Sequence, residues 1–206
     1  MKVAREFMNK SASCLLLSVA LVNGPTVRAV DETPPAHNPA IHAGAGQKKE
    51  LFAGITEADF LKLGDKPKVA KVTLVVGLTD ANSWMNFNGY SHGKATYVIP
   101  VGWTVEVTFI NPSPAPHSAI VVERDQVKLP QFKESAFAGA STPTPAVGIS
   151  TGKATFTFTA SEPGAYAFAC GYPMHSAGGH WLALEVSATA AKPTLSLGEL
   201  PPREAK

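Results

Sequence analysis

The chain has little of several features that mark specialised classes of sequence. Among its 206 residues only two are cysteine and 17% are charged, with a formal net charge of +2. So few cysteines exclude a disulfide-rich scaffold. No basic block or aromatic-interleaved basic patch points to nucleic acid. Hydrophobic residues still make up 45% of the chain, which is enough for a packed core, and the length suits one domain with extensions.

Residues 1–29 have the pattern of a secretory signal peptide. A positive start precedes a short apolar run at 12–22, and Val27-Arg28-Ala29 offers a cleavage site. The run is too short to span a bilayer comfortably. An uncleaved N-terminal anchor has a similar pattern and is the alternative; only then would the protein be held at a membrane. The pattern predicts an exported protein, periplasmic or extracellular.

Export makes the cysteine count informative. Cys14 lies inside the predicted signal, so the mature chain would keep only Cys170. A single cysteine cannot form an internal disulfide, and a free thiol in an oxidising compartment is a liability unless it is buried, paired or metal-bound. Loss of the signal also removes most of the basic excess, so the positive charge of the full chain says little about partners.

A leader precedes the predicted domain. Residues 30–69 begin with a stretch rich in Pro, Ala and Gly that has no apolar period, which predicts a flexible segment. Within the leader, residues 56–63 are predicted to form a short helix. Thr56 would be its N-cap, and Asp59 would occupy the acidic position three residues later.

From residue 70 onward the apolar period changes to two. Short alternating runs separated by Pro and Gly turns predict an all-β sandwich spanning residues 70–187. Residues 125–152 are expected to form a long surface loop, and residues 188–206 an extended tail. The alternating apolar residues include Val72, Leu74, Val76, Val105, Val107, Phe109, Phe156, Phe158, Leu182, Leu184 and Val186.

Three residues with the spacing Cys-x4-His-x4-His follow one of these strand patterns: Cys170, His175 and His180. Such a loop can place a thiolate and an imidazole on one metal ion. A further ligand must come from elsewhere, and His117 is the best candidate because prolines stiffen the segment before it. One thiolate and two imidazoles with a weak axial group are typical of electron-transfer copper sites. The residues therefore predict one mononuclear copper ion, although zinc also accepts such ligands.

The same region resembles the C-terminal copper loop of the cupredoxins, the type 1 blue copper proteins, and looks closest to the sulfocyanin and rusticyanin branch. Two other segments, 86–89 and 97–103, also resemble sulfocyanins, and the similarity covers about residues 70–187. The copper-loop segment reads Pro163-Gly164-Ala165-Tyr166-x-Phe168-x-Cys170-x-x-Pro173-x-His175-x4-His180-Trp181.

The resemblance implies a cupredoxin-like Greek-key β-sandwich with copper at one end. It places His117, Cys170 and His175 at the equatorial ligand positions. It also suggests Ser118 as a residue whose hydrogen bonds tie the His117 loop to the Cys170 loop.

One position departs from the family pattern. Members carry an axial methionine where this chain has His180. An imidazole is a harder and stronger donor than a thioether, so we expect it to draw copper toward tetragonal geometry, lower the reduction potential and shift the colour from blue toward green or yellow. It can also titrate on and off the metal. Met174 adjoins His175, so its side chain should point away from the site.

These observations predict a carrier of single electrons between respiratory partners such as a c-type cytochrome or a terminal oxidase. Contact would occur at the apolar end near His175 and would be transient. No acid/base pair or nucleophile arrangement supports an enzyme. The alternative is an open copper site that binds or reduces nitric oxide or nitrite. Copper delivery is a further reading, although a buried thiolate should exchange metal slowly.

Overall fold

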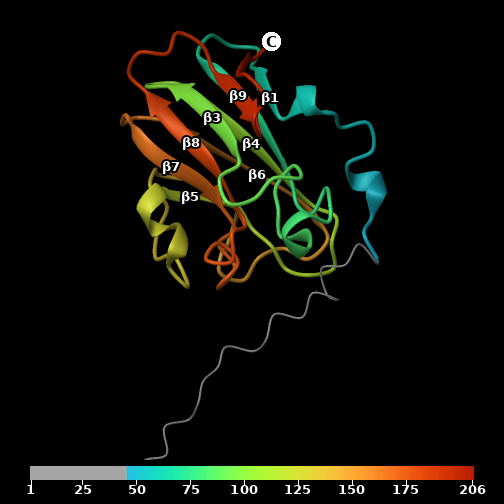
Figure 1. The fold of residues 1–206 in the computed structure, drawn as a ribbon. Helices are drawn as coiled ribbons and strands as arrows, with labels where there is room; N and C mark the ends of the chain where they lie inside the picture. The colour runs from blue at the N-terminus through green and yellow to red at the C-terminus, as the bar shows by residue number, and fades with distance from the viewer. Residues whose placement is uncertain (1–45) are drawn as a thin grey trace, which may run out of the picture. The chain divides into compact units, whose positions relative to one another are not determined.

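A computed structural model describes residues 46–206 (Figure 1). The predicted signal peptide, Cys14 and the first part of the predicted leader lie outside these residues. Within residues 46–206, no helix has the length and apolar character needed to cross a membrane. The described chain consists of two β-sheets and four short 3₁₀ helices. The β-sandwich predicted from the alternating pattern is confirmed.

The first sheet has four strands in the order β1 (Leu61–Leu63), β2 (Val69–Val75), β4 (Thr104–Asn111) and β6 (Gly152–Thr159). β2 and β4 are parallel, and the other pairs are antiparallel. In β6, Phe156 and Phe158 are buried while the threonines between and beside them are exposed. The period of two therefore separates an inner apolar face from an outer polar face.

The second sheet has six strands in the order β10 (Arg203–Glu204), β9 (Thr194–Leu197), β3 (Ala95–Pro100), β8 (Trp181–Ser187), β7 (Gly164–Ala169) and β5 (Ile120–Glu123). β3 pairs with β8 in parallel, whereas β7 pairs with both β8 and β5 in antiparallel fashion. Figure 1 shows β7 and β8 side by side, and the loop joining them carries the Cys-x4-His-x4-His pattern.

The main core lies between the sheets and is rich in aromatic side chains. Tyr97 and Phe168 meet edge to face with ring centroids 5.4 Å apart, and Phe158 lies 6.5 Å from Phe168. The hydroxyl of Tyr97 is fully buried, and Asn88 Nδ2 donates a hydrogen bond to it at 3.0 Å. The buried Tyr97 hydroxyl is therefore paired as well as packed, which favours a single fixed arrangement of this ring.

The strands extend beyond the bounds predicted from the alternating pattern. The helix expected at 56–63 is only a 3₁₀ turn, η2 (Glu57–Asp59), although Thr56 and Asp59 form the expected capping box. Leu61 is buried and pairs with Val72, so the chain continues as β1 instead of as a helix. In the predicted tail, β9 pairs with β3 and β10 pairs with β9. Burial and strand pairing outweigh the weak local preferences of these short segments.

The long loop expected at 125–152 is more structured than the sequence indicates. It begins with η4 (Arg124–Lys128), and Val127 packs on the outer face of the second sheet. Further on, Phe137 enters the main core, and the Ala140 carbonyl accepts a hydrogen bond from Val121 N. The remaining 3₁₀ helices are η1 (Lys49–Leu51) and η3 (Ala81–Trp84).

Candidate metal centre

Four potential ligand residues meet at one end of the sandwich. Each of them offers one donor atom, and these atoms lie within 4.8 Å of one another. All four residues are buried, and His175 keeps the largest exposed fraction, 6%. The fold therefore brings together every residue that the sequence singled out as a possible ligand: His117, Cys170, His175 and His180.

The distances around the sulfur suit a metal ion. Cys170 Sγ lies 3.8 Å from Nδ1 of His117 and 3.5 Å from Nδ1 of His175. A metal about 2.0–2.3 Å from each nitrogen and sulfur donor keeps those donors roughly 3.5–4 Å apart. A thiolate with imidazoles is also the donor set that copper electron-transfer sites use. The residues present therefore fit a copper ion.

The sulfur sits at the end of a buried strand. Cys170 directly follows β7, and its backbone N–H donates to the His180 carbonyl at 2.9 Å. Burial raises the pKa of the Cys170 thiol to about 11, and hydrogen bonds from Ser118 and Tyr172 oppose that rise only in part. Without a cation the thiol is therefore neutral near pH 7. A bound cation would stabilise the thiolate and displace the proton.

His117 is held in a loop between β4 and β5 by backbone pairing. Its N–H donates to the Ile149 carbonyl at 3.2 Å, and Ile149 N donates back at 2.7 Å. Asn111 Nδ2 donates to the same Ile149 carbonyl at 2.6 Å. Gly148, at φ +75°, passes so close that an added Cβ would lie 3.0 Å from the His117 backbone. The backbone of His117 is thus held in place by a second chain segment, which limits where its imidazole can lie.

Ser118 joins three segments through its hydroxyl group. The oxygen accepts a hydrogen bond from Gly171 N at 2.9 Å, and the hydroxyl donates to the Pro145 carbonyl at 2.8 Å. Gly171 follows Cys170, so the first bond connects the His117 loop with the loop that begins at the sulfur. The second bond adds the segment that contains Gly148.

The two loop histidines have different surroundings. The His175 ring packs against Tyr172, with centroids 4.7 Å apart. The His180 ring packs against Phe87 at 4.2 Å and lies 5.1 Å from the His117 ring. Their backbones are coupled, because His180 N donates to the His175 carbonyl at 3.0 Å. His175 therefore faces the rim of the site and His180 faces the core.

Met174 is 47% exposed, so its side chain extends largely into solvent. This agrees with the expectation that it points away from the site. Sequence reasoning gave no role to Phe87, which packs against the His180 ring. Phe87 lies in the segment 86–89, which resembles sulfocyanins, and this resemblance is the one sequence signal for it.

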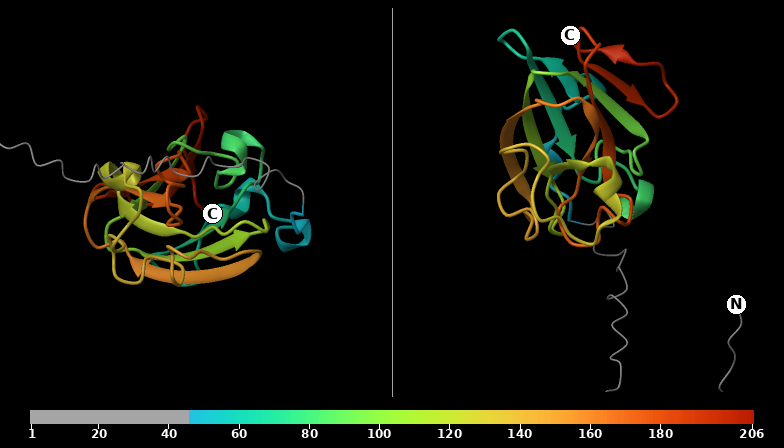
Figure 2. Two further views of the ribbon diagram at one scale, coloured as in Figure 1. Left: turned by 90° about the horizontal axis from the view of Figure 1, so that it is seen from below. Right: turned by 90° about the vertical axis from the view of Figure 1, so that its left-hand side faces the viewer.

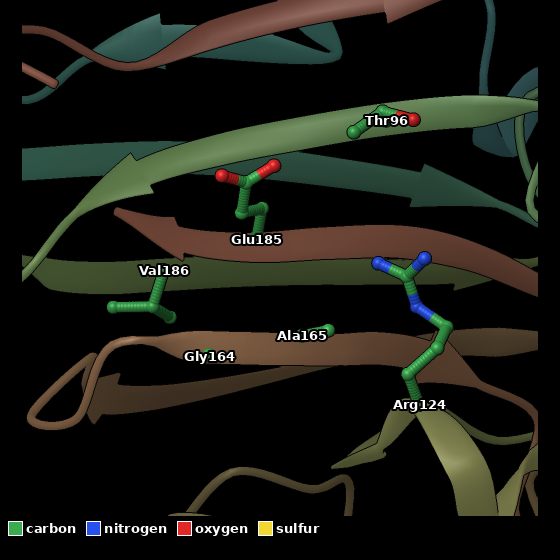
Figure 3. Close-up of a pocket in the computed structure, with 6 residues that line it drawn as sticks. All are labelled: Thr96, Arg124, Gly164, Ala165, Glu185 and Val186. Atoms are coloured by element: carbon green, nitrogen blue, oxygen red, sulfur yellow. The ribbon is translucent and has the colours of Figure 1, made fainter. Parts of the chain in front are cut away.

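A pocket of about 450 Å³ lies elsewhere, over β3, β8 and β7 (Figure 3). None of the four clustered residues lines it, so it is not a substrate pocket at the metal centre. In Figure 3 the side chains of Arg124, from η4, and Glu185, from β8, border it. The lining residues are Thr96, Arg124, Gly164, Ala165, Glu185 and Val186.

Comparison with known proteins gives consistent matches. Residues 58–196 match the sulfocyanin (SoxE) domain. A sulfocyanin from Sulfolobus acidocaldarius is 33% identical over 135 residues, which cover 61% of this chain and 67% of the relative. Reduced auracyanin from Roseiflexus castenholzii is 26% identical, with a TM-score of 0.42, over 57% of this chain and 96% of that one. Reduced rusticyanin is 18% identical, with a TM-score of 0.43, over 68% and 97%.

Proposed function

The chain belongs to the sulfocyanin family of copper-binding cupredoxins, and from this premise we propose that it carries single electrons on one copper ion held by His117, Cys170 and His175. The observation that supports this most strongly is the buried sulfur 3.8 and 3.5 Å from two imidazole nitrogens. When bound, copper supplies a one-electron couple between Cu(I) and Cu(II).

The residues of the chain contribute rigidity and exclusion of water. The donors come from a strand end and from loops fixed by backbone hydrogen bonds, so they move little when the charge of the site changes. Burial of all four side chains keeps solvent from the metal position. A site that rearranges little on oxidation or reduction exchanges electrons quickly, which suits a carrier.

His180 is proposed as the fourth, axial ligand. Its donor atom belongs to the same cluster, within 4.8 Å of the other three. The Phe87 ring, 4.2 Å away, limits how far the imidazole can rotate. A nitrogen donor stabilises Cu(II) more than a thioether does, so the reduction potential should lie below that of a variant carrying methionine at this position.

Electrons would enter and leave at the His175 edge. Exposed apolar side chains belong to the segments hydrogen-bonded around this end: Leu129, Val147 and Met174 are 46%, 67% and 47% exposed. Pro130, next to Leu129, accepts a hydrogen bond from Met174 N. A small apolar patch suits a transient redox partner such as a c-type cytochrome or a terminal oxidase. The predicted signal peptide supports export to the periplasm or the cell exterior.

The test is an optical and EPR study of the copper-loaded protein and two variants. Cys170→Ser should abolish the intense sulfur-to-copper absorption, because no thiolate remains. His180→Met should make the band bluer and raise the potential. Unchanged absorption in Cys170→Ser would overturn the proposal, and identical spectra for His180→Met would remove His180 from the ligand set.

Reduced protein mixed with oxidised cytochrome c should then lose its electron in a rapid second-order reaction. A matched control adds nitric oxide or nitrite to the oxidised protein. If the protein is an electron carrier, its optical and EPR spectra should not change on this addition. A new copper signal would favour the small-molecule function. Release of copper to a chelator within seconds would instead favour delivery.

A further inference from the structure

Residues 171–180, here called the ligand loop, are held from outside by two different parts of the chain. Figures 1 and 2 show the segment after β5 and the segment before β3 at the same end of the sandwich as this loop. The bonds of the first segment reach Met174, Ser176 and Ala177, so residues 171–177 are here called the first half of the loop. The bonds of the second segment reach Gly178 and Gly179, so residues 178–180 are called the second half. The pattern suggests that His175 and His180 are positioned separately.

The first half of the loop is held by residues 124–130. Met174 N donates to the Pro130 carbonyl at 2.8 Å, and Ser176 Oγ donates to the Val127 carbonyl at 2.8 Å. Met174 and Ser176 are the two neighbours of His175. The Ser176 bond is buried, so its loss would leave a carbonyl without a partner in a place that water does not reach.

The segment 124–130 is itself anchored to the second sheet. Arg124 donates to the carbonyls of Tyr166 and Leu184, which belong to neighbouring strands β7 and β8. Its guanidinium lies 5.8 Å from the centre of the Trp181 ring. Val127 is 95% buried against the outer face of the sheet. The first half of the ligand loop thus rests on a fixed support.

The second half of the loop is held by residues 82–92. Asn82 Nδ2 donates to the Gly178 carbonyl at 3.1 Å, and His92 N donates to the Gly179 carbonyl at 2.7 Å. Gly178 and Gly179 directly precede His180. The His92 ring occupies the space that a Cβ on Gly179 would need. Neither of these two bonds involves the segment 124–130.

Asn82 is placed by an unusual turn. Asn82, Ser83 and Trp84 have φ values of 52°, 53° and 68°, so three successive residues are left-handed. Asparagine tolerates this conformation, whereas it is costly for most other residues. The second N–H of Asn82 donates to the Met85 carbonyl at 2.8 Å, which closes the turn. The amide that reaches Gly178 is therefore pre-oriented by strained backbone.

We propose that Asn82 is a positioning residue for His180, and that each half of the ligand loop is held by its own outer segment, in addition to the bonds within the loop from Gly178 N to the Met174 carbonyl and from His180 N to the His175 carbonyl. The segment 124–130 fixes His175, whereas Asn82 and the His92 amide fix His180. The inference rests on the proposed copper function for its meaning, because the position of His180 could then be adjusted with less disturbance of His175. The division of the loop can be measured without copper.

The test uses three variants of the metal-free full chain. Asn82→Gly keeps the left-handed backbone, because glycine adopts positive φ freely, and removes only the amide. Ser83→Gly is the matched control in the same turn, since Ser83 is exposed and makes no side-chain hydrogen bond within the described structure. Ser176→Ala removes the buried bond of the other half.

Amide hydrogen exchange reports each half separately. Asn82→Gly should speed exchange of the His92 N–H roughly twofold to tenfold, the factor for loss of one hydrogen bond, and leave the Met174 N–H unchanged. Ser176→Ala should do the reverse, and Ser83→Gly should do neither. Equal acceleration of both amides in every variant would show that the loop opens as one unit and would overturn the proposal.

The copper-loaded variants give the second readout. Asn82→Gly should shift the EPR parameters and the potential, while Ser83→Gly should match the parent protein. Asn82→Asp, which tolerates the same backbone but lacks the N–H donor, should behave like Asn82→Gly. Identical EPR spectra in all of them would overturn the role of Asn82. If Cys170→Ser keeps the copper absorption, the copper function fails while the exchange result still decides the division of the loop.

Discussion

The two sheets of the sandwich differ in how many of their faces are buried. In β6 of the four-stranded sheet, Phe156 and Phe158 are buried but the threonines between and beside them are exposed. In β7 of the six-stranded sheet, Phe168 enters the main core and Ala167, on the opposite face, is also fully buried. A second apolar cluster around Val127 covers that outer face. The part of the six-stranded sheet that leads to Cys170 is therefore covered by apolar side chains on both faces.

This difference explains why the candidate ligands lie where they do. A strand packed on both faces has little freedom to shift, so the loop at its end begins from a fixed position. The four-stranded sheet has an exposed outer face and supports the site through Asn111 at the end of β4, which donates to the Ile149 carbonyl that pairs with His117. Four predictions test the contrast, from the largest expected effect to the smallest.

Copper loading should stabilise the folded chain by about 4 kcal/mol when free copper exceeds the Kd a thousandfold. Calorimetry with and without the metal measures the change. Protection from hydrogen exchange should increase most in the ligand loop and β7, and least in β1 at the far edge of the other sheet. Equal gains in β1 and β7 would show that the sheets respond as one unit and would break the comparison.

Ala167→Asp should destabilise the protein by about 3 kcal/mol or more, because it leaves a charge buried without a partner. Thr157→Asp is the matched change on the exposed outer face of β6 and should cost less than about 1 kcal/mol. Urea denaturation of both variants gives the two values. Similar decreases in the free energy of unfolding of the two variants would mean that the outer faces of the two sheets are equally exposed to water.

Val127→Ala should cost about 1–2 kcal/mol, because it removes two methyl groups from the outer cluster. Leu129→Ala, nearby but 46% exposed, should leave stability nearly unchanged. The same denaturation curves provide the measurement. A neutral Val127→Ala would indicate that η4 covers the sheet loosely and adds little to its rigidity.

Acid should weaken a contact at the edge of the four-stranded sheet. Hydrogen bonds from Lys62 and from Thr56 lower the pKa of Asp59 from 3.8 to about 2. A carboxyl whose pKa is lowered by folding adds stability above its ordinary pKa and loses it as pH falls through the folded value. The loss should therefore fall between about pH 4 and pH 2.

This effect should be the smallest of the four, since the pair is exposed. Urea midpoints measured across that pH window should fall less for Asp59→Asn than for the parent protein. An equal fall in both would assign the acid sensitivity to other carboxyl groups.

Much of the fold could be predicted because its strands alternate clearly. Phe156 and Phe158 lie among threonines, and the pattern left no competing interpretation. β1 and β10 have only three and two residues, which is too short to show a period. Their pairing depends on partners distant in sequence, such as Val72 for Leu61, and local preference carries no record of such partners.

The candidate ligands could be predicted from residue type and spacing, but of their supports only Ser118 could be, through the family resemblance. Cysteine and histidine are common metal ligands, and their residue type can be read directly from the sequence. The bonds that hold the ligand loop end on backbone carbonyls, such as those of Val127 and Gly178. A carbonyl is present at every residue, so its role depends on position and not on the side chain. The identity of the axial ligand stays a prediction until spectra are measured.

The parallel pairing of β3 with β8 has a consequence for the time course of folding. Pairing of strands that lie far apart in sequence slows folding, because the entropy of closing a large loop is lost before the strand contacts form. His117 and Cys170 are themselves 53 residues apart, and β8 follows both of them along the chain. During folding, the Cys170 thiol would thus be exposed until β8 pairs with β3 and the site closes around the sulfur. Burial of the sulfur and binding of the metal should therefore both occur late in folding.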